Sequence, residues 1–329
     1  MTIELTTGLS REYRREDYIT KQSGTHIDRD CPTPIWKQFL DVVTDQNVEL
    51  QNYLQRVAGY CMTGSIREHA LFFLYGTGAN GKSVFLSTLN GVWGDYAVTA
   101  PMDTFLETHG DRHPTELAFL RGARLVIAQE TERGRRWAQA KLQSLTGGDD
   151  ITARYMRQDF FTFRPQFKLV IAGNHKPSLS SVDEAIRRRF HLVPFTVTIP
   201  KDERDPKLLE KLKAEWPGIL AWATQGCLDW QSTGLNPPPV VTQASEAYFA
   251  EEDTVGRWIE ECCGVDEIYK ERVTELFDNW KRWAETGNER VGSQKAFSQN
   301  LERKGFERGR NNEGQMIFSG VGLRTPGMA

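Results

Sequence analysis

The feature that most constrains the fold is a glycine-rich motif that follows a short apolar run near residue 71. It reads Gly76-Thr77-Gly78-Ala79-Asn80-Gly81-Lys82-Ser83 and fits the pattern G-x-x-x-x-G-K-[ST]. Residues 71–75 predict a strand before the motif and residues 82–89 a helix after it. Glycines let backbone N–H groups turn toward phosphate oxygens, and a helix N-terminus adds a positive dipole end. The motif therefore predicts a phosphate-binding loop (P-loop) in an α/β fold.

The P-loop motif also predicts the cofactors, ATP and Mg²⁺. Lys82 is expected to meet the β- and γ-phosphates, and Ser83 is expected to hold the metal ion. The residues expected to contact the nucleotide are Gly76, Thr77, Gly78, Ala79, Asn80, Gly81, Lys82, Ser83 and Val84.

Two further apolar runs, residues 124–128 and 167–172, predict buried strands that end in polar residues. After the first run, Glu130 is the candidate that binds in the Mg²⁺ shell and orients the attacking water, with Glu132 as a weaker alternative. Gln129 stands where many P-loop ATPases carry a second acid. After the second run, Asn174 is expected to hydrogen-bond the γ-phosphate or the water.

A pair of arginines, Arg188 and Arg189, is a candidate for stabilising transition-state charge. A guanidinium that reaches the γ-phosphate of a neighbouring subunit couples hydrolysis to subunit contact. The alternative is a basic helix face paired with Asp183 and Glu184.

The domain organisation follows from changes in pattern along the chain. We expect a lead-in at residues 1–30, a helical region at 31–68 in which Asp45 caps the second helix, an α/β core with a mostly parallel sheet at 69–236, and a linker with a C-terminal module at 237–329. A fourth strand is expected at residues 190–197, and three successive prolines (237–239) mark the linker. Helices expected at 244–263, 268–286 and 293–304, with a hairpin turning at 311–314, predict a winged-helix-like module.

Composition excludes several classes of protein. The 329 residues are 39% hydrophobic and 26% charged, which is typical of a globular protein. No apolar run is long enough to span a bilayer, and no secretory leader is recognisable, so we expect no membrane association and a cytoplasmic location. The five cysteines lack C-x-x-C spacing and are expected to be reduced core thiols. The net charge of −3 does not indicate a nucleic-acid binder, but a whole-chain charge conceals local patches.

Taken in order, these motifs resemble those of superfamily 3 helicases of the AAA+ type, specifically the helicase part of phage and plasmid primase-helicases. The resemblance also includes Leu145-Thr146-Gly147-Gly148-Asp149 and Ala172-Gly173-Asn174-His175-Lys176-Pro177. It implies a homohexameric ring that hydrolyses ATP between subunits and translocates on DNA, 3′ to 5′. Lys82, Ser83, Glu130 and Asn174 then belong to one subunit and the arginine finger to the next. Both Arg188 and Arg189 match the family's paired arginines, and the sequence does not distinguish them.

The resemblance also gives a role to residues 151–163, whose alternation about a polar centre predicts a hairpin. In the family such a hairpin contacts the DNA backbone. Arg157 is expected near the tip, and Arg154 or Lys141 are alternative sources of the phosphate-binding charge.

Family members usually carry a primase domain upstream, and residues 5–20 resemble the connector that follows it. We therefore expect either a short helicase or a piece of a longer primase-helicase. Because no primase-like cluster of acids is recognisable, we expect no primer synthesis by this chain. The alternative function is an ATP-regulated, DNA-binding replication initiator or loader with little unwinding. A small-molecule kinase lacks the expected acceptor-binding region.

Overall fold

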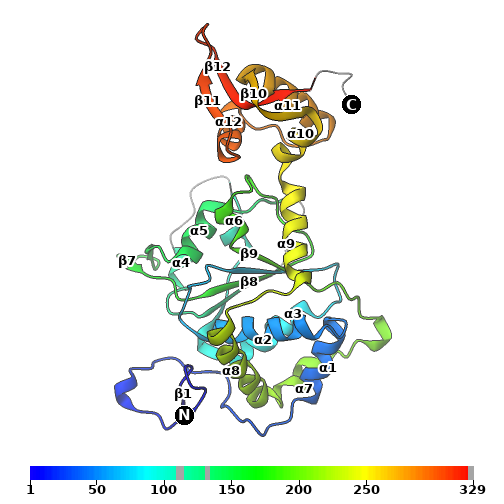
Figure 1. Cartoon of the computed structure of the whole chain (residues 1–329). Coiled ribbons are helices and arrows are strands. Elements are labelled where there is room, and N and C mark those ends of the chain that lie inside the picture. Colours follow the sequence, from blue (N-terminus) through cyan, green and yellow to red (C-terminus); the bar gives the residue numbers. More distant parts are fainter. Residues whose placement is uncertain (109–114, 130–133, 325–329) are drawn as a thin grey trace. The chain divides into compact units, whose positions relative to one another are not determined.

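The computed structural model describes residues 1–108, 115–129 and 134–324. Two compact units make up the chain (Figure 1). Unit 1 comprises Met1–Ser180 and Glu184–Ser245, and unit 2 comprises Ser181–Asp183 and Glu246–Ala329. The division falls inside helix α9 (Pro239–Glu252), which begins at the third proline of the expected linker.

Unit 1 is built on a five-stranded sheet in the order β4-β5-β8-β3-β9, with all neighbours parallel. The strands are β3 (Leu71–Tyr75), β4 (Ala97–Thr99), β5 (Leu125–Gln129), β8 (Lys168–Gly173) and β9 (Phe190–Pro194). All six residues of β8 are buried, as expected for a central parallel strand covered on both faces. The mixed α/β fold with a parallel sheet is thus confirmed, and β4 is an edge strand that the sequence analysis did not predict.

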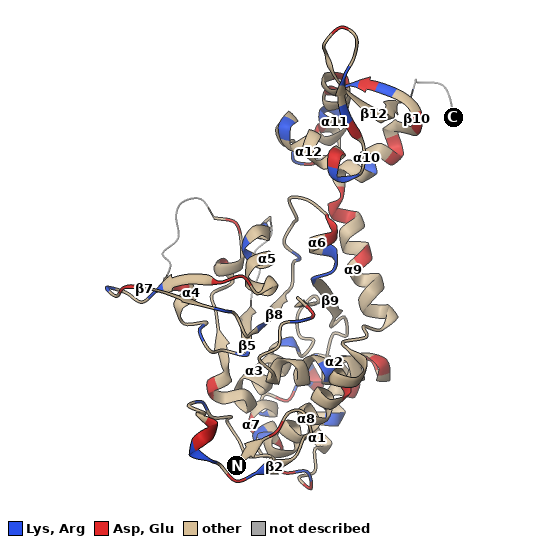
Figure 2. Ribbon diagram, turned by 60° about the vertical axis from the view of Figure 1, so that its left-hand side comes forward, with Lys and Arg blue, Asp and Glu red and all other residues tan. Residues whose placement is uncertain are grey.

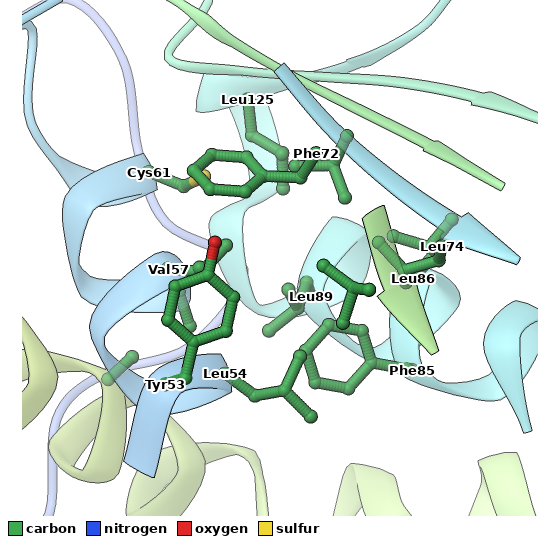
Figure 3. Close-up of a cluster of buried hydrophobic side chains, with 14 of the residues drawn as sticks. Tyr53, Leu54, Val57, Cys61, Phe72, Leu74, Phe85, Leu86, Leu89 and Leu125 are labelled. Atoms are coloured by element: carbon green, nitrogen blue, oxygen red, sulfur yellow. The ribbon is translucent and has the colours of Figure 1, made fainter. Parts of the chain in front are cut away.

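Helices α2 (Val48–Met62) and α3 (Lys82–Trp93) pack on one face of this sheet. Figure 3 shows Tyr53 and Leu54 of α2 and Phe85 of α3 gathered beneath Phe72 of β3 in this apolar cluster. On the opposite face, Phe73 and Phe190 both contact the ring of Trp137. Residues 31–68 and the sheet therefore share one hydrophobic core.

The remaining elements of unit 1 surround this core. They are the strands β1 (Thr2–Ile3), β2 (Ser10–Arg11), β6 (Ile151–Arg154) and β7 (Phe160–Phe163), the α-helices α1 (Pro34–Val43), α4 (Thr115–Ala118), α5 (Gln139–Gly147), α6 (Glu184–Arg187), α7 (Leu208–Lys213) and α8 (Trp216–Thr233), and the 3₁₀-helices Arg15–Asp17, Gly94–Tyr96, Met102–Phe105 and Lys201–Glu203.

The starts of two helices in unit 1, α1 and α2, are fixed by side chains that accept hydrogen bonds from backbone N–H groups. The buried Glu215 carboxylate accepts from the N–H groups of Ile35 and Trp36 at 2.9 and 2.8 Å, which satisfies the start of α1. Helix α2 is capped by Asn47, whose side chain accepts from the Leu50 N–H. Asp45 is therefore not the cap; it lies in the preceding turn with φ +52°.

Unit 2 combines three helices with a three-stranded antiparallel sheet in the order β10-β12-β11. Its elements are α10 (Thr254–Cys262), β10 (Cys263–Arg272), α11 (Val273–Thr286), α12 (Gln294–Arg303), β11 (Glu307–Arg310) and β12 (Met316–Leu323). The helix expected over 268–286 is wrong at its start, because residues 263–272 pair with β12 as a third strand. The expected single helix over 244–263 is also wrong, because α9 ends at Glu252 and Asp253 caps the separate helix α10.

Two further expectations can be compared with the structure. Cys61, Cys227 and Cys263 are buried, whereas Cys31 and Cys262 are only half-buried, so not every thiol lies in a core. Within the described ranges, no helix combines the length and apolar character needed to cross a bilayer. Figure 2 shows basic and acidic residues interspersed along both units, in agreement with the small net charge.

Candidate functional site

The predicted P-loop lies at the edge of the sheet where parallel strands end. Residues 76–83 join the end of β3 to the start of α3. The last residue of β3, Tyr75, lies opposite Gly173, the last residue of β8. Asn174 follows Gly173 directly, so the sheet register brings this amide next to the loop. Crevices outside the carboxyl ends of parallel strands are the usual ligand sites of α/β sheets.

Strand β5 ends at the same edge, because its last residue, Gln129, lies opposite Ala172 of β8. Glu130, the expected metal-shell and water-orienting carboxylate, comes next in the sequence but lies outside the described residues, as does Glu132. The described part of β5 therefore ends at Gln129 on the loop's side of the sheet, and the role of Glu130 stays a prediction.

The backbone of the loop turns through conformations that side chains disfavour. Gly78 and Gly81 have φ values of +107° and +83°. A Cβ atom on Gly81 would also lie 2.4 Å from Cγ1 of Val43 and 2.9 Å from Cε2 of Phe39, so the loop rests closely on α1. A side chain at this position would displace either the loop or the helix.

The Lys82 ammonium is the centre of the site. Its Nζ donates to the Gly76 carbonyl oxygen at 2.7 Å, to Asn80 Oδ1 at 3.0 Å and to Asn174 Oδ1 at 3.2 Å. All three protons of the ammonium thus have acceptors. The side chain is 5% exposed, and this burial lowers the pKa of Lys82 to about 8. The structure therefore brings together two of the residues predicted separately, Lys82 and Asn174.

Asn80 links this lysine to the far side of the loop. Its Oδ1 accepts from Lys82, and its Nδ2 donates to the Phe195 carbonyl oxygen at 2.8 Å, just beyond the end of β9. Asn80 is buried. Asn80 was predicted among the phosphate-contacting residues, but this bridge was not, since nothing local in the sequence pairs positions 80 and 195.

Other side chains at the loop are accessible to solvent. Thr77 and Ser83 are exposed and Val84 is half-buried, with Ser83 in the first turn of α3. A hydroxyl at this position, a buried cation and a helix N-terminus together suit a phosphate group with an associated hard metal ion.

The two arginines of the predicted finger differ sharply in their surroundings. Arg189 is 7% exposed; its Nε donates to Thr146 Oγ1 at 3.2 Å and one terminal nitrogen donates to the Ala185 carbonyl oxygen at 2.5 Å. Arg188 is exposed, and its guanidinium has no hydrogen bond or ion pair with any part of the chain that the structure describes. The alternative of a face paired with acids therefore does not describe Arg188.

Both arginines lie at the opposite edge of the sheet from the P-loop. They precede Phe190, which pairs with Leu71 at the start of β3, whereas the loop follows Tyr75 at its end. Five residues of extended strand separate these edges by roughly 15 Å at ~3.3 Å per residue. This span exceeds the reach of an arginine side chain, so Arg188 does not reach the predicted P-loop of the same chain.

The predicted hairpin at 151–163 is present as β6 and β7, paired antiparallel with Arg154 opposite Phe160. Arg157 lies in the exposed turn between the strands with φ +59°. The turn projects from the body of unit 1 in both views (Figures 1 and 2). Lys141 is half-buried on α5 and is not part of the hairpin.

Two family models match the sequence. One, described as a family of unknown function (DUF5906), matches residues 74–189. The other, described as D5 N terminal like, matches residues 1–45. The first match spans the P-loop, Asn174 and both arginines.

Curated relatives carry helicase names. The chain is 27% identical over 312 residues to "Putative helicase L207/L206" of Acanthamoeba polyphaga mimivirus. It is 26% identical over 251 residues to "Putative helicase 022R" of Frog virus 3 (isolate Goorha). These alignments cover 85% and 69% of this chain but only 32% and 25% of the relatives. The chain thus spans about a third or a quarter of their length, and the matches indicate a primase-helicase-like protein.

Solved structures show the same fold at low sequence identity. The apo structure of the NrS-1 C-terminal region (305–718) aligns with a TM-score of 0.51 at 10% identity, covering 91% of this chain and 77% of that chain. An A-form apo structure of the same region aligns with a TM-score of 0.51 at 9% identity, covering 91% and 78%.

The contrast between the two arginines predicts unequal effects on stability. Arg189→Met should lower the free energy of unfolding of unit 1 by about 1.5–3 kcal/mol, because it removes hydrogen bonds made by a buried charged group. Arg188→Met is the matched control and should change it by less than about 0.5 kcal/mol. Thermal and urea unfolding of the two variants measure the difference. Equal losses for both variants would contradict this assignment.

Proposed function

We propose that this chain is an ATP-dependent DNA helicase of superfamily 3, with an AAA+ core that hydrolyses Mg-ATP between the subunits of a hexameric ring. The observation that carries the proposal is the contact of Lys82 Nζ with Asn174 Oδ1 at the end of the P-loop strand. It joins a phosphate-binding lysine to an amide suited to sense the γ-phosphate, and the helicase names of the viral relatives support the same function.

Each residue of the site then has a chemical task. Lys82 binds the β- and γ-phosphates, and to do so it exchanges at least one of its present acceptors for phosphate oxygen. Asn174, released from Lys82, can hydrogen-bond the γ-phosphate or the attacking water. Ser83 holds Mg²⁺, and Glu130 orients the water and accepts its proton. The metal ion, when bound, neutralises charge on the phosphate oxygens.

Arg188 is our choice for the finger that acts on a neighbouring subunit's nucleotide. It is exposed and has no polar partner among the described residues, and it lies at the sheet edge opposite its own P-loop. Arg189 instead holds α6 and the start of β9 to α5 through Ala185 and Thr146. This arrangement supports our proposal of a ring in which each subunit completes the next one's site.

The proposed polymer is DNA, contacted by the β6–β7 hairpin through Arg157 and Arg154. We propose that unit 2 is a winged-helix-like module, on the basis of its three helices and three-stranded sheet. Translocation would be 3′ to 5′ in a viral or plasmid replication system, with a primase as a further part or partner. The alternative, an initiator or loader, shares every feature of the site and differs only in unwinding little DNA.

The lowered pKa of Lys82 predicts a pH-dependent affinity for nucleotide. A neighbouring phosphate favours the charged ammonium, so binding draws a proton onto Lys82 once the pH exceeds its nucleotide-free pKa of about 8. ATP-analogue affinity should fall roughly tenfold from about pH 7.5 to about pH 9.5. Titration calorimetry in two buffers would also report the proton uptake.

Lys82→Met is the control for this titration. This variant should bind nucleotide weakly and without the pH dependence, because the methionine side chain at position 82 does not titrate. If the affinity of wild type and of Lys82→Met changed with pH in the same way, a phosphate contact by Lys82 would be contradicted.

Subunit mixing distinguishes the two arginines. Arg188→Ala and Lys82→Met should each lack ATP turnover, since each breaks every interface of its own ring. In equal mixtures, about a quarter of the interfaces pair an intact site with an intact finger, so about a quarter of wild-type turnover should return. As the control, Arg189→Met keeps both Lys82 and Arg188, so it should turn over ATP alone, and mixing it with Lys82→Met should give turnover in proportion to its share of the subunits with no recovery beyond that. No recovery with Arg188→Ala would exclude it as the finger.

A further inference from the structure

The β6–β7 hairpin has two faces of different character. Alternation places Ile151, Ala153, Phe161 and Phe163 on the inner face, where the first two are buried and the last two half-buried. The ring of Tyr155 stacks on Phe161 at 5.2 Å, and its hydroxyl donates to the Ala118 carbonyl oxygen at 3.3 Å. The inner face therefore has its partners within unit 1.

The outer face is polar, with one exception. Thr152 lies opposite Thr162, with their hydroxyl oxygens 3.5 Å apart, and Arg154 lies opposite Phe160. Phe160 is 60% exposed. It is an aromatic residue on a face of the hairpin whose other strand positions carry polar side chains. The Arg154 guanidinium carbon lies 4.8 Å from the centroid of the Phe160 ring, so a cation–π contact orients this aromatic side chain.

The charges around Phe160 favour an anionic ligand. Arg164 at the base of the hairpin is paired with Asp150 at 3.6 Å. In the turn, Asp159 is the single acid and Arg157 the single base, and Arg154 at the end of β6 adds a second positive charge. The Arg157 guanidinium has no ion pair among the residues that the structure describes. The tip thus combines an oriented, exposed aromatic ring with a small excess of positive charge.

We propose that Phe160 stacks on an unpaired base of the DNA strand, with Arg154 orienting the ring and Arg157 meeting the adjacent phosphate. Proteins that bind single strands combine cations along the backbone with aromatic rings on which bases stack. In a duplex the base faces are covered by their neighbours, so an exposed ring selects a single strand. This inference rests on the proposed function and specifies its substrate as unpaired DNA at the hairpin.

The test compares two labelled strands of equal length in the presence of a non-hydrolysable ATP analogue. One is oligothymidine, and the other has the same backbone with abasic sites throughout. Wild type should bind oligothymidine roughly tenfold more tightly. Phe160→Leu should lower that affinity to the abasic value and leave abasic binding unchanged, whereas Phe160→Trp should retain the preference.

Two control variants separate stacking from charge. Arg157→Gln should weaken binding of both strands alike and reduce the salt slope by about one. Tyr13→Leu changes another exposed aromatic residue, in the N-terminal segment, and should have no effect.

Three results would overturn the inference. Phe160→Leu could keep the preference for bases, which would place stacking elsewhere. Wild type could bind both strands equally, which would limit the hairpin to backbone contacts. If Phe160→Leu changed the mass of the oligomer and kept the base preference, the Phe160 side chain would belong to a contact between copies of the chain. Failure of wild type to bind either strand would instead remove the proposed function as well.

Discussion

The site depends on how a buried positive charge is accommodated. The Lys82 ammonium is almost wholly removed from solvent, and an unpaired charge there would cost several kcal/mol. Three oxygen atoms, from Gly76, Asn80 and Asn174, accept its protons. Two of these acceptors are set by the sheet rather than by the loop: Asn174 through the β3–β8 register, and Asn80 through its bond to Phe195 beyond β9.

The same sheet separates the two kinds of charge that the proposed reaction needs. Its carboxyl edge holds Lys82, and its amino edge holds the arginine pair before β9. Burial of Arg189 against Thr146 fixes the segment from which Arg188 extends into solvent. Under the proposed function, a single chain carries both the lysine and the arginine of a phosphate site but cannot bring its own two together. Association of subunits becomes a chemical requirement of the proposed hydrolysis.

The sequence predicted the parallel sheet well, because strands buried on both faces are continuous apolar runs. Strand β4 was not predicted because three residues carry too little pattern. The predicted start of α11 was wrong. The helical spacing of Val273 and Leu276 gave no sign that residues 263–272 pair with β12, about 50 positions away in the chain.

In the candidate site, too, some features could be predicted from the local sequence, whereas others depend on residues distant in the chain. The predicted P-loop and the place of Asn174 beside it follow from residue type after an apolar run. The choice between Arg188 and Arg189 does not, because the two are identical in type and their burial depends on Thr146 in another helix. The Asn80 bridge likewise arises from a contact between segments that the sequence does not pair.

The central claim is that nucleotide chemistry at Lys82 drives the separation of DNA strands. Strand displacement on a forked DNA with a 3′ tail, with ATP and Mg²⁺, tests it most directly. The account predicts that wild type separates the strands and that Lys82→Met does not. ATP hydrolysis without strand separation on this fork would contradict the claim and favour the loader.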